Sequence, residues 1–235
     1  MTKHSPRADG VLALLGGGEW TDSYRALDEE LLEASGGQTV VVLPTAAAFE
    51  HPGRVVERAA TWFESLGATV VPLMAIHRTE AEDAARAAVV KDASFIYLSD
   101  GSPLHLRSVL KDSALFAALV HAWHRGAVVA ASGAGATVLC DPMVDPRGGA
   151  YTVGLGMVSD LAVFPYHGSA AGHLLARSLD LLPKAATLVG VDEHTALLRT
   201  GPGAWRVGGS GTVTVYRGGE AAAHRAPDAV DLGER

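Results

Sequence analysis

Short apolar runs alternate with longer segments of helical spacing along the first 136 residues. Five runs predict buried strands, at residues 11–15, 39–43, 68–73, 94–99 and 127–131. Between them, apolar residues recur at helical spacing, as at Val55, Ala59 and Trp62, and glycines close several of these segments. Strands buried on both faces and joined by helices are typical of parallel sheets. We therefore predict an α/β fold with a doubly wound, mostly parallel sheet flanked by helices.

The last third of the chain has a different sequence pattern. Residues 141–151 are rich in Pro, Gly and Asp and predict a loop. Strands are predicted at residues 161–164, 187–191, 196–199 and 212–216, with hairpins at Gly201-Pro202-Gly203 and Gly208-Gly209. This pattern predicts a small antiparallel C-terminal extension at one edge of the sheet. We place one α/β domain over residues 1–220 and a polar C-terminal tail, expected to be frayed, over residues 221–235.

Composition narrows the possible partners and the compartment. Of the 235 residues, 48% are hydrophobic, which is enough for a large core. The net charge of −7 and the lack of a Lys/Arg cluster exclude a nucleic-acid-binding protein. No apolar run is long enough to cross a membrane, and the polar first ten residues do not resemble a signal peptide. With Cys140 as its single cysteine, the chain is expected to be cytoplasmic.

The segment Ser132-Gly133-Ala134-Gly135-Ala136 follows the fifth predicted strand and precedes a helix. Small residues at alternate positions allow a sharp strand–turn–helix elbow, whose apex side chain stands clear of the sheet. By position the apex is Gly133, which supplies no nucleophile, and the backbone N–H of Ala134 can hold an oxyanion. Ser132 should point to the opposite face of the sheet. Alternatively, these glycines only allow the helix to pack closely on the sheet.

Two further loops should lie beside this elbow. Gly16-Gly17-Gly18 follows the first predicted strand, and Asp100-Gly101-Ser102-Pro103 follows the fourth. Ligands of open parallel sheets bind beyond the carboxyl ends of the strands. The sequence therefore predicts an oxyanion or ligand pocket formed by Gly17, Gly18, Gly101, Ser102 and Ala134.

Five segments together resemble one family of enzymes. They are residues 14–18, 99–106, 130–143, 153–156 and 190–197. In order and spacing they are similar to the cyanophycinase and dipeptidase E family of serine peptidases, which has a class I glutamine-amidotransferase-like fold. The resemblance implies a Ser-His-acid mechanism on short acidic peptides, and a homodimer. We expect no cofactor.

The chain departs from that family at several positions. The nucleophile of the family falls on Gly133, and the family histidine on His167 or on a residue one place out of register. The acid expected after the elbow falls near Tyr151, where there is no carboxylate, and residues 170–173 replace the arginines that bind acidic substrates. Glu193, in Asp192-Glu193-His194, is a candidate acid, although such a residue more often bonds to local backbone.

Two main hypotheses follow. The first is a catalytically impaired member, a pseudoenzyme that binds a small peptide or small molecule at the former active site. The alternative is an active hydrolase of short or acidic peptides that uses Ser132 with His167. A third possibility, an amidotransferase-like module, would need a cysteine at the apex. No metal site is expected, because His121 and His124 lack further ligands nearby, and Cys140 is expected to be buried and inert on the helix after the elbow.

Overall fold

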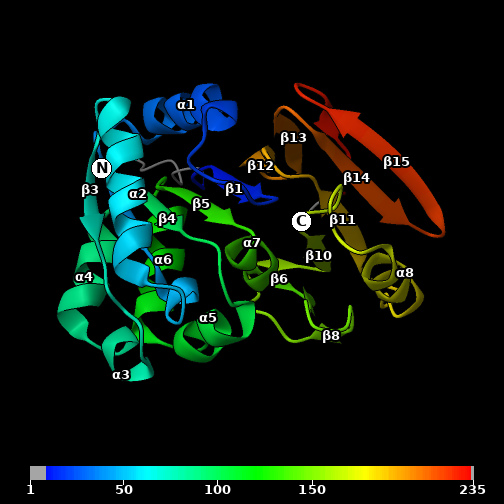
Figure 1. Ribbon diagram of the computed structural model, residues 1–235, viewed down its shortest axis with the longest axis horizontal. Coiled ribbons are helices and arrows are strands. Elements are labelled where there is room, and N and C mark those ends of the chain that lie inside the picture. Colours follow the sequence, from blue (N-terminus) through cyan, green and yellow to red (C-terminus); the bar gives the residue numbers. More distant parts are fainter. Residues whose placement is uncertain (1–8, 234–235) are drawn as a thin grey trace, which may run out of the picture.

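The computed structural model describes residues 9–233, and a mixed sheet of eight strands runs through its larger half (Figure 1). The strand order is β16-β13-β12-β1-β5-β4-β2-β3. Its parallel strands are β1 (Leu12–Leu15), β2 (Thr39–Leu43), β3 (Thr69–Pro72), β4 (Phe95–Leu98) and β5 (Val128–Ser132). Four of these five strands are buried along most or all of their length, β3 at the edge being the exception. The predicted doubly wound, mostly parallel sheet is confirmed.

Helices cover both faces of this sheet. On one face α1 (Arg25–Ser35), after the short 3-10 helix η1 (Asp22–Tyr24), and α2 (Pro52–Ser65) enclose an aromatic-rich core. On the other face lie η2 (Thr45–Ala47), α3 (Arg78–Ala81), α4 (Ala84–Asp92), α5 (Pro103–Leu110), α6 (Ala114–His124) and α7 (Ala134–Leu139). Adjacent residues of a strand point to opposite faces, so each buried strand contributes side chains to both cores.

The C-terminal part adds a second sheet, in the order β10-β11-β14-β15. Its strands are β10 (Leu161–Phe164), β11 (Thr187–Val191), β14 (Thr212–Arg217) and β15 (Glu220–Arg225). Helix α8 (Gly172–Asp180), which the sequence analysis did not predict, packs against this sheet. The predicted loop after the elbow contains the short strands β6 (Cys140–Asp141), β7 (Met143–Val144) and β8 (Tyr151–Thr152), and β9 (Val158–Ser159) follows.

Antiparallel strands extend the main sheet, as predicted, but two details were wrong. Gly201-Pro202-Gly203 does join β12 (Thr195–Gly201) to β13 (Ala204–Gly209). Gly208-Gly209 makes no hairpin, because β13 belongs to the main sheet whereas the next strand, β14, belongs to the second. The expected fraying is also absent from residues 220–230, where β15 pairs with β14, and β16 (Ala229–Val230) with β13. The division at residue 220 stays a prediction.

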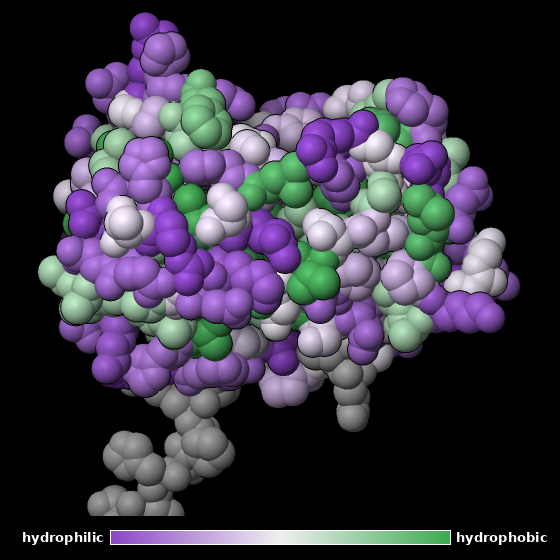
Figure 2. All heavy atoms as spheres, turned by 90° about the horizontal axis from the view of Figure 1, so that it is seen from below, coloured by the Kyte–Doolittle hydropathy of each residue, from purple (hydrophilic) through white to green (hydrophobic). Residues whose placement is uncertain are grey.

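The face of the molecule seen in Figure 2 is largely polar. Figure 2 shows a face of mostly hydrophilic side chains, on which apolar side chains form small separate patches. Within residues 9–233 no helix combines the length and the apolar character needed to cross a membrane.

Candidate functional site

The turn between β5 and α7 has its apex at Gly133. Its backbone angles, φ 47° and ψ −102°, lie in a region that side-chain-bearing residues rarely adopt. The Gly133 N–H donates to the carbonyl of Leu15 at 3.0 Å, which ties the elbow to the end of β1. Ser132 therefore ends the strand and Ala134 begins the helix, as the sequence pattern predicts.

The carboxylate of Asp100 fills the space directly above Gly133. Its Oδ1 accepts hydrogen bonds from the N–H groups of Ala134 and Gly101, each at 2.7 Å. A Cβ added at Gly133 would lie within 3.0 Å of three atoms of this carboxyl group. The Ala134 N–H, predicted to hold an oxyanion, is thus already bonded to a side chain of the same chain.

Tyr166 closes this arrangement from the side of the second sheet. It follows β10 in a left-handed conformation (φ 55°), and its N–H donates to the carbonyl of Gly16 at 2.8 Å. Its ring covers Gly17, and its hydroxyl donates to Asp100 Oδ2. Burial, with the negative charge of Asp100, raises the pKa of Tyr166, so the phenol stays protonated as a donor. We call Asp100, Gly133 and Tyr166 the crown cluster.

Ser132 lies on the far side of the elbow from this cluster. It is fully buried, and its Oγ donates to Glu19 Oε2 at 2.8 Å. In β5 it shares its face with Ala130, which packs in the core beneath α1 and α2. Glu19, which follows the glycine loop, is only 6% exposed, and its other oxygen accepts the Asp100 N–H at 3.4 Å. Ser132 therefore faces away from the crown cluster, as predicted.

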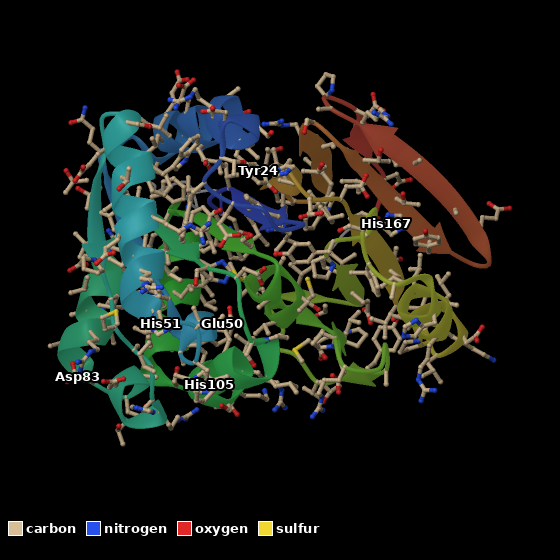
Figure 3. The ribbon with its side chains drawn as sticks, viewed as in Figure 1. Tyr24, Glu50, His51, Asp83, His105 and His167 are labelled. Atoms are coloured by element: carbon tan, nitrogen blue, oxygen red, sulfur yellow. The ribbon has the colours of Figure 1, made fainter. Side chains whose placement is uncertain are left out.

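His167 lies among the strands of the second sheet (Figure 3). Its Nδ1 is 3.1 Å from Asp192 Oδ1, and its Nε2 is 2.7 Å from the hydroxyl of Tyr216. Its ring packs on Gly190, where an added Cβ would come within 3.0 Å of it. Both ring nitrogens thus have partners, and among the described residues no hydrogen bond joins His167 to Ser132. The residue that reaches the elbow is Tyr166, one place earlier.

The remaining predicted residues surround the elbow in supporting positions. Ser102 caps α5, since its Oγ accepts the N–H of His105 at 3.4 Å. Gly18 lies under the ring of His194, as Gly17 lies under Tyr166. Glu193 accepts a hydrogen bond from Ser169 Oγ at 2.7 Å. The three predicted loops therefore do meet at one edge of the sheet. Glu193 bonds to a serine side chain 24 residues earlier rather than to the local backbone.

A cavity of about 210 Å³ opens beside the crown cluster. Asp100 and Tyr166 line it together with Ala134 and Thr137. The rest of its wall is mainly apolar and includes Pro103, Val144, Pro146, Phe164, Ala170 and Leu174. No lysine or arginine lines it within the described part of the chain. Such a cavity suits a small ligand with an apolar body.

Two other candidates lie away from the elbow. Cys140 begins β6 rather than lying on the preceding helix, and its complete burial raises the pKa of its thiol. His124 Nδ1 is 2.8 Å from Asp9 Oδ1. Among residues 9–233 there is no group of three or more His, Cys, Asp or Glu residues that could hold a metal ion.

The sequence pattern does not reveal the roles of Asp100, Tyr166 and Glu19. Asp100 opened a loop that was correctly placed at the sheet edge, and Glu19 followed another. The missing information was the contact of each side chain with the elbow, which joins residues far apart in the chain. The available signal was the clustering of three loops at the carboxyl ends of neighbouring strands, which directs attention to every polar residue on those loops.

Comparison with known proteins identifies the family of the chain. The model of peptidase family S51 matches residues 12–206, a range that includes the whole crown cluster. The chain belongs to peptidase family S51. This confirms the resemblance to the cyanophycinase and dipeptidase E serine peptidases. No protein with a curated description matches the chain.

Two solved structures are similar to this S51 chain. A peptidase from an acI-B1 Actinobacterium has a TM-score of 0.88 and 26% identity, over 97% of this chain and 99% of the other. A protein assigned as peptidase E from Listeria monocytogenes EGD-e has a TM-score of 0.63 and 18% identity, over 93% and 99%. The second likeness shows the fold alone. Both agree with the predicted peptidase fold.

Proposed function

We propose that this S51 chain binds a small peptide or small molecule at the crown cluster and does not cleave peptides by the serine mechanism of its family. The observation that carries the proposal is the position of the Asp100 carboxylate above Gly133. It takes the space that a nucleophilic side chain at the apex would need. It also bonds the N–H group that would hold the oxyanion.

The electrostatics of this position oppose acyl transfer. A tetrahedral intermediate places negative charge on an oxygen, and free N–H donors aimed at that oxygen stabilise it. Here the donor of Ala134 is bonded to a carboxylate at 2.7 Å. An oxyanion entering the same place would meet a group of like charge in a partly buried setting, which raises rather than lowers its energy.

One observation favours the alternative, a serine hydrolase that uses Ser132. Its hydroxyl lies 2.8 Å from a carboxylate oxygen of Glu19, a distance at which a base can accept a proton. However, Ser132 is fully buried beneath α1 and α2, and His167 is bonded to Asp192 and Tyr216 instead. A substrate carbonyl would have to enter the core to reach this hydroxyl, so the contacts favour binding over hydrolysis.

A fluorophosphonate probe, which labels activated serines, tests the proposal directly. We expect no labelling of the wild-type protein at a probe concentration that fully labels an active serine hydrolase in the same tube. Ser132→Ala is the matched variant. If the wild-type protein is labelled and Ser132→Ala is not, the chain is an active serine hydrolase and the proposal fails.

Rebuilding the active site is a second test. Gly133→Ser alone should stay unlabelled, because Asp100 occupies the space of the new side chain. Adding Asp100→Gly removes the obstruction, and adding Tyr166→His places an imidazole where the phenol now reaches the crown cluster. We expect labelling only in the combined variant. Labelling of Gly133→Ser by itself would show that Asp100 does not block the apex.

A further inference from the structure

We propose that the ligand of the crown cavity is a small monovalent amine with an apolar body, whose ammonium group bonds to Asp100. This inference rests on the proposed binding function and names the chemical class of the ligand. It contrasts with the acidic peptides that the family resemblance implies. Four features of the cavity support it: the acceptor capacity of Asp100, the surrounding charge, the apolar wall and the volume.

Asp100 has a vacant acceptor position. A carboxylate offers about four lone-pair positions on its two oxygens. Oδ1 accepts from the N–H groups of Gly101 and Ala134, whereas Oδ2 accepts from the Tyr166 hydroxyl. These described contacts use three of the positions and leave one on Oδ2. Because Asp100 and Tyr166 both line the cavity, a donor in the cavity can bond there.

The charge around the cavity favours a cation. The negative charges of Asp100, Glu19 and Glu193 all act to raise the pKa of Tyr166, after burial itself, so their fields add at its hydroxyl. Among the residues that the structure describes, no lysine or arginine lines the cavity to offset them. A ligand carboxylate would therefore be repelled, whereas an ammonium group would gain a charge-assisted hydrogen bond.

The walls limit the rest of the ligand. Val144, Phe164 and Leu174 offer apolar surface, and a second charge against them would be left unpaired at high cost. At about 210 Å³ the cavity is smaller than the roughly 300–1,000 Å³ typical of sites for drug-sized ligands. The ligand is therefore small and carries a single positive charge.

Benzylamine is a suitable probe, and benzoate and benzyl alcohol are its anionic and neutral counterparts. We expect isothermal titration calorimetry of the wild-type protein to detect benzylamine binding, weaker binding of benzyl alcohol and none of benzoate. Asp100→Asn keeps an acceptor for the two N–H groups but removes the charge. It should weaken benzylamine binding by roughly tenfold to a hundredfold. Asp180→Asn, an exposed change of the same kind at the end of α8, should have no effect.

Three results would overturn the inference: no benzylamine binding, equal or stronger binding of benzoate, or unchanged affinity in Asp100→Asn. If Asp100→Asn does not fold, the ranking of the three wild-type ligands still decides. Leu174→Trp locates the site, because filling the cavity should abolish binding, and persistent binding would place the amine elsewhere. The fluorophosphonate result is separate. Labelling defeats the proposed binding function, whereas failed amine binding in an unlabelled protein defeats this inference alone.

Discussion

The two sides of the elbow hold their carboxylates in different ways. On the crown side, both oxygens of Asp100 accept hydrogen bonds, three in all. On the side of α1 and α2, Asp28 is fully buried, and its Oδ2 accepts a hydrogen bond from the indole N–H of Trp62 at 2.8 Å. Within residues 9–233, neither its Oδ1 nor the buried hydroxyl of Tyr97 nearby has a hydrogen-bond partner. Glu19 links the two sides, because one of its oxygens accepts the Asp100 N–H and the other accepts the Ser132 hydroxyl.

The difference shows what the elbow itself imposes. A sharp turn into a helix leaves N–H groups pointing at the apex whatever the side chains are, and a carboxylate placed there is held by existing donors. Among the described residues, the one side-chain donor bonded to Asp28 is the indole N–H of Trp62, so burial dominates and raises the pKa of Asp28 to about 7. We therefore expect substitutions in the crown cluster to change stability through steric contacts and hydrogen bonds. Substitutions in the core beneath α1 and α2 should change it through the charge of Asp28.

The largest expected effect is a pH dependence at Asp28. Its pKa is about 7 in the folded protein and about 3.9 in an unfolded chain. Because the pKa of Asp28 is raised in the folded protein, the neutral carboxyl group contributes fully to the stability of the fold below about pH 4. This contribution is lost as the pH rises through 7. Asp28→Asn cannot ionise and keeps an acceptor for Trp62. The difference in the free energy of unfolding between Asp28→Asn and the wild-type protein should grow in favour of the variant by about 3 kcal/mol from pH 5 to pH 8.

Urea denaturation at the two pH values measures this change. Asp180→Asn serves as the control, because it removes one carboxylate at an exposed position and leaves Asp28 in place. A difference between Asp28→Asn and the wild type that does not depend on pH would mean that Asp28 is not held neutral by burial.

Gly133→Ala should have an effect of similar size on stability. The added Cβ meets the Asp100 carboxylate, and the positive φ is itself strained for alanine. Together these should lower the free energy of unfolding by about 3 kcal/mol. In an Asp100→Gly background only the strain remains, so the same change should cost roughly half as much, within the 1–3 kcal/mol range for strained residues.

Gly53→Ala is the matched control for this cycle. Gly53 lies in α2, and an added Cβ there meets no atom within 4 Å, so the substitution should be neutral or slightly stabilising. If Gly133→Ala costs the same with and without the Asp100 side chain, the carboxylate does not occupy the apex in solution.

The strands and the elbow that frame this comparison were predictable from the sequence. Apolar runs bounded by glycine predicted β1, β2, β4 and β5 because buried parallel strands need little more than apolar residues. The small residues at 132–136 predicted the elbow because only they fit the turn. The hydrogen bonds of Asp100 with Ala134 and Tyr166 could not be predicted, since they join residues 34 and 66 positions apart. Helix α8 was missed because it begins at Gly172, directly after Ala170 and Ala171, and this run of small residues resembles a loop.

Ser132→Ala should have an intermediate effect. It removes the hydroxyl that donates to Glu19 and leaves a buried carboxylate oxygen without that partner. The expected loss in the free energy of unfolding is about 2 kcal/mol. Ser169→Ala is the control, because Ser169 also donates to a carboxylate, that of Glu193, but at an exposed position. Denaturation curves that show equal costs for the two variants would contradict the burial argument.

Tyr166→Phe should have the smallest effect on stability and separates the two roles of this side chain. The ring still covers Gly17, so packing is kept, and only the hydrogen bond to Asp100 is lost, at a cost of about 1 kcal/mol. Asp100 keeps its two backbone donors, so benzylamine binding should persist. A loss as large as that of Gly133→Ala, measured by the same denaturation assay, would instead make the phenol the group that holds the carboxylate in place.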